Sequence, residues 1–364
     1  MSEILVKKLN QLNTLIDLIA LINSTLDTRE IRKRAIEAAT RLAEAEAGSL
    51  LLIDKNSGEL FFEVALGEKG AEVKETRLKK GEGIAGWVAE KGEAVIIHDV
   101  QSDPRFFKEA DIKSNFVTRN MICVPVRTKD KVVGVLEAIN KKADRFNDDD
   151  MEMLSSLANE VAVAIENANL YQELKDTFYG TAQALAETIE KRDPYTGGHT
   201  KRVMNYSLAI GRMMGLNKAE LENLKLSAIL HDIGKIGIRD KILMKKGRLE
   251  PAEIEMMNMH PKYGSEILKH VKQLKDIIPG MRGHHEKYDG SGYPDGLKGN
   301  QIPLAARIIA VADTFDAITT DRPYSKALSV DAAFDEMKKN AGRQFDPEVL
   351  AAFLDAWKSM EITA

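Results

Sequence analysis

The sequence predicts a multidomain protein with an α/β (α+β) domain built on an antiparallel sheet, a long helical linker and an all-α C-terminal domain. Residues 48–140 contain short runs rich in β-branched and aromatic residues, and turn residues separate these runs. From about residue 150 onward the apolar pattern is almost entirely helical. The length of 364 residues also favours two domains over one.

Five strands and one short helix are expected in the α+β domain. The residues 54–58, Asp-Lys-Asn-Ser-Gly, separate the first two runs and predict a hairpin turn. The glycine-punctuated residues 81–92 predict the entry into a short helix. The expected strands are residues 48–54, 59–66, 93–99, 121–127 and 131–140.

Two apolar stripes at heptad spacing flank this domain. The first consists of Leu5, Leu9, Leu12, Ile16 and Ile19, and the second of Leu154, Leu157, Val161, Ala164, Ala168 and Tyr171. One interpretation is parallel pairing of two copies, which predicts a homodimer through the N-terminal and linker helices. The alternative is that each stripe packs on its own domain, and stripes this short do not separate the two.

Composition limits the classes of function. The net charge of −4, from 52 basic and 56 acidic residues, gives no electrostatic case for nucleic-acid binding. No apolar run approaches the ~18–20 residues of a membrane span, so we expect no membrane association. The first residues lack a signal-peptide pattern, which favours a cytoplasmic location. The single cysteine, Cys123, excludes an intramolecular disulfide, and its apolar neighbours predict a core position.

Residues of metal-ligand type gather in the helical part of the chain, next to apolar neighbours. Six of them are candidates to converge on one cavity: His231, Asp232, His260, His284, His285 and Asp313. Six N and O ligands exceed the needs of one four-coordinate zinc and suit two metals that share a carboxylate. Each residue alone has a structural explanation, such as an ion pair between Asp313 and Arg307, but together they favour a metal site. We interpret His98 and His270 as hydrogen-bonded core residues.

Cations and an aromatic residue accompany these candidate ligands. Lys235 follows Asp232 by three residues, which places both on one helix face, where the lysine can neutralise a phosphate. Arg322 follows Asp313 by nine residues, and Tyr293 lies in a glycine-rich loop where its ring can stack on a base. Metals with these groups predict phosphoester hydrolysis on a nucleotide.

Four motifs in the C-terminal half are similar to those of a known family. His-Asp at 231–232 with Gly-Lys at 234–235 resembles the HD-domain metal phosphohydrolases, and residues 284–294, HHEKYDGSGYP, resemble the HD-GYP subfamily. Residues 192–203 and 311–324 resemble its flanking motifs, so the resemblance covers about 176–364.

This resemblance implies an all-helical domain that hydrolyses cyclic di-GMP at a centre of divalent metals, iron or manganese. It implies the same six ligands, with Asp232 bridging and acting in catalysis together with Lys235. The residues implied around the substrate phosphates are Asp193, Lys235, Tyr293 and Arg322.

One position departs from the subfamily pattern. Some members carry a glutamate, which helps to hold a third metal, where this chain has Tyr195. We therefore expect two metals and linear pGpG as the main product, with further hydrolysis to GMP as the alternative. His199 stays open as a ligand, a structural residue or a substrate contact.

The α+β domain, residues 27–168, resembles a GAF domain that follows an N-terminal helix over 1–26. The NKFDE motif of nucleotide-binding members is incomplete, because Met151 replaces its glutamate. We interpret its Asn140 and Lys141 as a staple between the last strand and the following helix. The resemblance implies an unknown small ligand for this domain, which would regulate the phosphodiesterase through the linker at 150–192.

Two alternative functions remain. The chain could be an HD-type hydrolase of another nucleotide, such as a dNTP or an alarmone. It could also be a non-catalytic cyclic di-GMP receptor or scaffold that docks a diguanylate cyclase through the loop around Tyr293.

Overall fold

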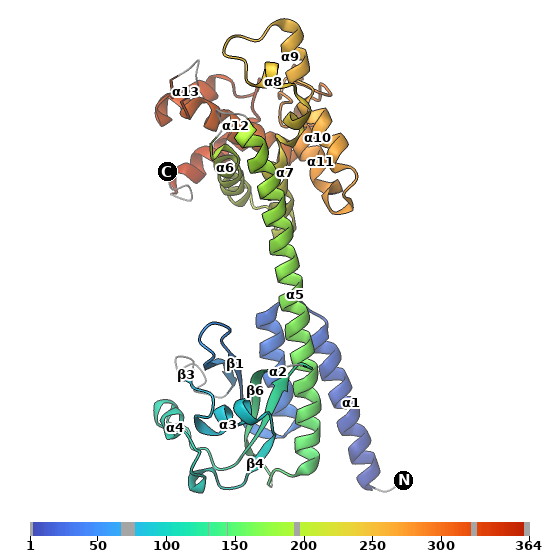
Figure 1. Cartoon of the computed structure of the whole chain (residues 1–364), viewed down its shortest axis with the longest axis vertical. Helices are drawn as coiled ribbons and strands as arrows, with labels where there is room; N and C mark the ends of the chain where they lie inside the picture. Colours follow the sequence, from blue (N-terminus) through green and yellow to red (C-terminus); the bar gives the residue numbers. More distant parts are fainter. Residues whose placement is uncertain are drawn as a thin grey trace. The chain divides into compact units, whose positions relative to one another are not determined.

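The chain divides into two compact units, Met1–Lys175 and Asp176–Ala364. Both are drawn in Figure 1, a computed structural model. The structure describes residues 3–66, 77–129, 131–143, 145–192, 197–321 and 326–359. Each unit is treated by itself below.

The described residues of the first unit form one antiparallel sheet of six strands in the order β3-β2-β1-β6-β5-β4. The five expected strands are present. Strand β3 was not expected, because two residues are too few to show an alternation of apolar and polar residues. In the hairpin between β1 and β2, the amide of Asp54 donates to the carbonyl of Glu59 at 2.8 Å. The strands are β1 Ala45–Ile53, β2 Leu60–Leu66, β3 Arg77–Leu78, β4 Val95–Ile97, β5 Met121–Arg127 and β6 Val132–Lys141.

Helices cover both faces of this sheet. Apolar side chains of α1, α2 and the first half of α5 form one core with Leu50 and Leu136 of the sheet. The short helix α3 packs with Leu51 and Cys123 on the other face, where Figure 1 also places α4. Cys123 is fully buried, as expected. The helices are α1 Glu3–Asn23, α2 Thr28–Leu42, α3 Gly83–Lys91, η1 Val100–Ser102, α4 Lys108–Ser114 and α5 Asp148–Arg192.

The two apolar stripes have different environments. In the second stripe the residues from Leu154 to Ala168 are buried in the core of their own unit, whereas Tyr171 is exposed. In α1 Leu15 and Ile22 are buried in the core, and Ile19 of the first stripe packs against it. The middle of the first stripe faces solvent instead, with Leu9 52%, Leu12 49% and Ile16 61% exposed. The second stripe therefore packs within its own domain.

The expected staple at the end of the sheet is confirmed. Lys141 at the end of β6 forms a 2.6 Å ion pair with Asp150 in the first turn of α5. Asn140 has a φ of 56° and its amide oxygen accepts the amide N–H of Arg119. Lys141 therefore joins β6 to α5 as expected, whereas Asn140 joins β6 to the segment before β5.

The regular secondary structure of the described residues of the second unit is helical, apart from an isolated bridge between Ala341 and Phe345. One of its cores contains an aromatic cluster of Phe315, Phe334 and Phe353. The last turns of α5 contribute Ala182, Ala186 and Ile189 to a second core. The helices are α6 His199–Met213, α7 Lys218–Leu230, η2 Ile233–Gly237, α8 Asp240–Leu243, α9 Pro251–Met257, α10 His260–Leu268, η3 Lys272–Ile277, α11 Ile278–Arg282, η4 Gly299–Gln301, α12 Leu304–Thr319, α13 Val330–Lys339 and α14 Pro347–Lys358.

Two histidine predictions are wrong. His98 and His270 are both exposed rather than buried. His98 directly follows the three-residue strand β4, and His270 lies beyond the end of α10. Apolar neighbours in the sequence therefore did not determine the direction of either side chain.

Among the described residues, none of the helices has the length and the hydropathy that crossing a bilayer requires.

Candidate metal centre

Three buried histidines are oriented by the same local hydrogen bond. In each ring Nδ1 lies within hydrogen-bonding distance of the backbone carbonyl three residues earlier, and the exposed fraction of each residue is 2% or less. A proton on Nδ1 satisfies that carbonyl, so Nε2 points away from the helix end and is the atom that can bind a cation. The pairs are His231 with Ala228 at 2.7 Å, His260 with Met257 at 2.8 Å and His284 with Met281 at 2.6 Å.

A carboxylate orients the fourth buried histidine. His199 is the first residue of α6, and its Nδ1 lies 2.7 Å from Oδ2 of Asp316. Arg202 in turn donates to both oxygens of Asp316. This chain of contacts leaves Nε2 of His199 free for the site. Sequence analysis missed Asp316 and Arg202, although Asp313 and Asp316 are three residues apart in a helical pattern and therefore share a face.

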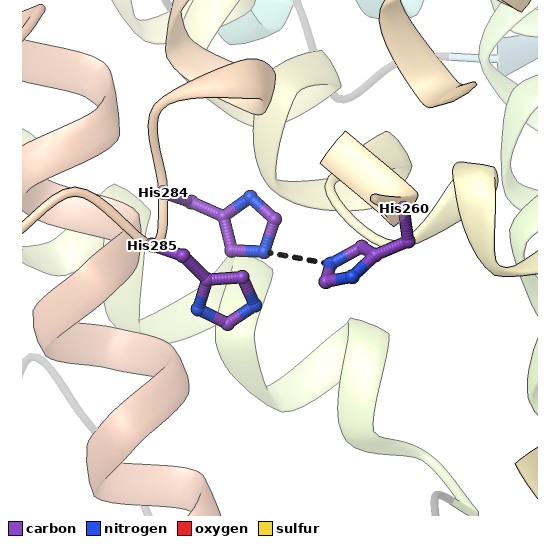
Figure 2. A group of neighbouring side chains, drawn as sticks. All are labelled: His260, His284 and His285. Carbon is purple, nitrogen blue, oxygen red and sulfur yellow. Dashed lines mark hydrogen bonds between the residues drawn. The ribbon is translucent and has the colours of Figure 1, made fainter. Parts of the chain in front are cut away.

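The free imidazole nitrogens converge in two groups. One group is His199, His231 and Asp313, and the other is His260, His284 and His285; within each, the potential ligand atoms lie within 4.8 Å of one another. Figure 2 shows the rings of the second group, with Nε2 of His260 and of His284 3.5 Å apart. Two nitrogens that both carry lone pairs repel each other, so a shared proton or a cation must satisfy them.

Asp232 lies between the two groups. Its Oδ1 is 3.3 Å from Nε2 of His260, and its Oδ2 is 3.4 Å from Nε2 of His231. Nε2 of His199 lies 3.9 Å from Oδ2. One carboxylate oxygen therefore faces each group, which is the geometry that a bridging ligand requires.

A tight backbone contact explains why glycine follows the His-Asp pair. The expectation that Asp232 and Lys235 share one face of an α-helix is wrong. Helix α7 ends at Leu230, Asp232 is the N-cap of the 3₁₀ helix η2, and Lys235 lies within η2. A Cβ atom on Gly234 would lie 1.8 Å from the carbonyl oxygen of His260. Glycine thus lets this turn pack directly on the first residue of α10. Lys235 still reaches Asp232, with 2.8 Å between Nζ and Oδ2.

The loop that contains Tyr293 is held by a residue that sequence analysis missed. The buried Glu286 accepts the backbone N–H groups of Asp295, Gly296 and Leu297. The Tyr293 ring lies on the His285 ring, with 4.9 Å between centroids. Burial, with added repulsion from Asp232 and Asp313, raises the pKa of the Tyr293 phenol, which therefore keeps its proton and can donate a hydrogen bond.

Burial and nearby charges shift the pKa values of His231 and His284 in opposite directions. Burial lowers the pKa of His231, but the Asp232 and Asp313 carboxylates outweigh it and raise that pKa to about 9. Burial and the neighbouring rings of His231 and His260 lower the pKa of His284 to about 3. A cation that binds at this centre would therefore have to displace a proton from His231, whereas His284 is already neutral.

The donor set fits two divalent metals. Each group supplies three ligand atoms, and Asp232 can supply one oxygen to each, so each metal would have four protein ligands. Imidazole and carboxylate together suit iron, manganese or zinc, and they do not select among these. The predicted residues Asp193, Tyr195 and Arg322 lie outside the described residues.

Two domain family models match successive parts of the chain. The family model of the GAF domain matches residues 25–166, and that of the HD domain matches residues 183–349. The protein therefore contains a GAF domain followed by an HD domain.

Its curated relatives include phosphodiesterases of cyclic dinucleotides. Cyclic di-GMP phosphodiesterase response regulator RpfG of Xanthomonas campestris is 40% identical over 193 residues, covering 52% of this chain and 50% of its own. A Cyclic di-GMP phosphodiesterase of Thermotoga maritima is 40% identical over 194 residues, covering 52% of this chain and 52% of its own. The 3'3'-cGAMP-specific phosphodiesterase 2 of Vibrio cholerae is 36% identical over 210 residues, covering 57% of this chain and 40% of its own. The chain thus spans about half or less of the length of these relatives.

Proposed function

We propose that this chain is a metal-dependent phosphodiesterase that hydrolyses cyclic di-GMP to linear pGpG. The observation that carries the proposal is the position of Asp232, with one oxygen facing each group of imidazole ligands. Relatives named as cyclic di-GMP phosphodiesterases support the choice of reaction.

The proposed ligands form two sets around Asp232. His199, His231 and Asp313 hold one metal, and His260, His284 and His285 hold the other. Nε2 of His199 lies 3.3 Å from Nε2 of His231 and 3.3 Å from Oδ1 of Asp313. This position favours a role as a metal ligand over a structural role or a substrate contact. Two bound divalent metals, iron or manganese, supply Lewis acidity and a nucleophile at neutral pH.

Other groups of the chain act on the substrate phosphates in this proposal. The Lys235 ammonium, held by Asp232, provides positive charge beside the reacting phosphate. The protonated phenol of Tyr293 donates a hydrogen bond to the same phosphate. Asp193 and Arg322 would act beside them, on the family resemblance alone.

The number of metals predicts the product. Because Tyr195 stands where a third-metal glutamate occurs in the subfamily, we expect two metals per chain and accumulation of pGpG. Tyr195→Glu would raise the metal content towards three and favour passage to GMP. A variant whose metal content stays at the wild-type value would contradict this role for position 195.

A second substrate is favoured by a specific observation, because three relatives are named as 3'3'-cGAMP-specific phosphodiesterases. Anaerobic turnover with Mn(II) or Fe(II) tests both dinucleotides, with the ratio of kcat/KM as the readout. We expect a higher kcat/KM for cyclic di-GMP than for 3'3'-cGAMP. The opposite result would make 3'3'-cGAMP the preferred substrate. The same assay with a dNTP or an alarmone tests the alternative that the chain hydrolyses another nucleotide. Binding without turnover by metal-loaded protein would favour the receptor or scaffold, and with it a cyclase partner.

Regulation and assembly complete the proposal. An unidentified small ligand of the GAF domain would control turnover. Two copies of the chain would pair through the exposed residues Leu9, Leu12 and Ile16 of α1. Leu12→Glu should halve the mass measured by light scattering, because a carboxylate would enter that apolar contact. Leu26→Glu is the matched control, since Leu26 is equally exposed but lies beyond the end of α1. A monomeric wild-type protein would refute the pairing.

A further inference from the structure

The last turn of α5 contacts the first turn of α6 beside a candidate ligand. Oε1 of Glu190 accepts the backbone N–H of Thr200 at 2.5 Å. Thr200 directly follows His199, the first residue of α6. The first N–H groups of a helix have no partner within the helix, so this carboxylate fixes the start of α6 from outside.

Two residues further along α5, Arg192 holds the other side of the centre. Its guanidinium donates to the backbone carbonyls of Ile236 at 3.0 Å and Ile238 at 2.9 Å, and more weakly to that of Lys235 at 3.4 Å. It also pairs with Asp240 at 2.7 Å. The forked guanidinium thus fixes the segment that follows Asp232 and carries Lys235.

Apolar packing beside Glu190 is incomplete. A cavity of about 200 Å³ lies between the end of α5 and the start of α6. Its lining includes Glu187, Glu190, Lys191 and Thr200. Ala186 and Ile189 of α5 pack in an apolar core beside it, and Glu190 adds a polar contact to the start of α6.

We propose that Glu190 and Arg192 are positioning residues, through which the end of α5 sets the geometry of the metal centre. Glu190 acts on His199 through the start of α6, and Arg192 acts on Asp232 and Lys235 through the carbonyls after them. This inference rests on the proposed function, since the ligands that the two residues position are those proposed to hold the metals.

Metal affinity tests the inference independently of turnover. In the full-length protein, Glu190→Ala and Arg192→Ala should each lower the affinity for Mn(II), measured by EPR titration, by about 10- to 100-fold. Glu190→Gln should stay within about twofold of wild type, because its amide oxygen still accepts the Thr200 N–H. Arg192→Lys keeps the charge without the fork, so it should fall between wild type and Arg192→Ala.

Two neighbours provide matched controls. Glu187 and Lys191 are exposed and line the same cavity, and Ala at either position should leave the Mn(II) affinity unchanged. If an alanine variant fails to fold, Arg192→Lys still decides the question. Wild-type affinity in Glu190→Ala, Arg192→Ala and Arg192→Lys would overturn the inference. Normal Mn(II) binding without hydrolysis of a cyclic dinucleotide by the wild type would instead refute the proposed function.

Discussion

Gly234→Ala is the sharpest test of how backbone packing sets the metal centre. The new Cβ would lie 1.8 Å from the carbonyl oxygen of His260, whereas ordinary van der Waals contact begins at 3.4 Å. The 3₁₀ turn and the start of α10 must therefore separate by about 1.6 Å, the difference between these two distances. Asp232 and His260 lie on opposite sides of this contact, with 3.3 Å between Oδ1 and Nε2.

A separation of this size exceeds what metal coordination tolerates. Metal–ligand distances vary by only about ±0.2 Å, and a misplacement of about 1 Å can lower turnover about 100-fold. We therefore expect Gly234→Ala to bind fewer than two metals and to lose at least about 100-fold in kcat.

The assay is metal analysis after anaerobic loading, with turnover measured on the same sample and circular dichroism as the folding check. Gly247→Ala is the control, because a Cβ on Gly247 would meet no atom within 4 Å. A folded Gly234→Ala protein with the metal content and turnover of the wild type would refute the reasoning.

Three further predictions concern the charges of the site. Lys235→Ala should keep both metals and lower kcat by about 10²–10⁴-fold, because its ammonium stabilises charge without being a ligand; unchanged kcat would make Lys235 a packing residue. Asp316→Asn should lower Mn(II) affinity by about 10- to 100-fold, because the carboxylate orients His199; equal affinity in an EPR titration would contradict this role. Metal affinity should rise with pH up to about 9, because His231, with a pKa of about 9, must lose a proton to bind a metal. Calorimetry in buffers of different ionisation enthalpy should detect the released proton, and a pH-independent affinity would contradict this assignment.

The fold was largely predictable because its signals are local. Five strands showed β-rich runs bounded by turn residues, and the Lys141–Asp150 staple connects residues nine apart. Heptad spacing was ambiguous, because a buried stripe on one domain and a seam between two copies show the same period. For α5, the burial of the residues from Leu154 to Ala168 in the GAF core shows that this stripe packs on its own domain.

The candidate site was predictable as a set of residue types, and its supporting contacts were not. Asp316 pairs with a histidine 117 residues away, and Glu190 reaches across a helix junction to a backbone N–H. Such partners carry no local signal, since any surface acid on a helix has the same sequence context. The histidines themselves were recognisable because polar residues recur beside apolar ones, but the same rule failed for His98.

EPR of the manganese-loaded protein tests the central claim most directly, the pairing of two metals across Asp232. Metals that share a carboxylate at about 3.5–4 Å are magnetically coupled. We expect two Mn(II) per chain with an exchange-coupled spectrum, and we expect Asp232→Ala to remove both the coupling and the two metals. One Mn(II) per chain, the six-line spectrum of isolated ions, or full metal content in Asp232→Ala would contradict it.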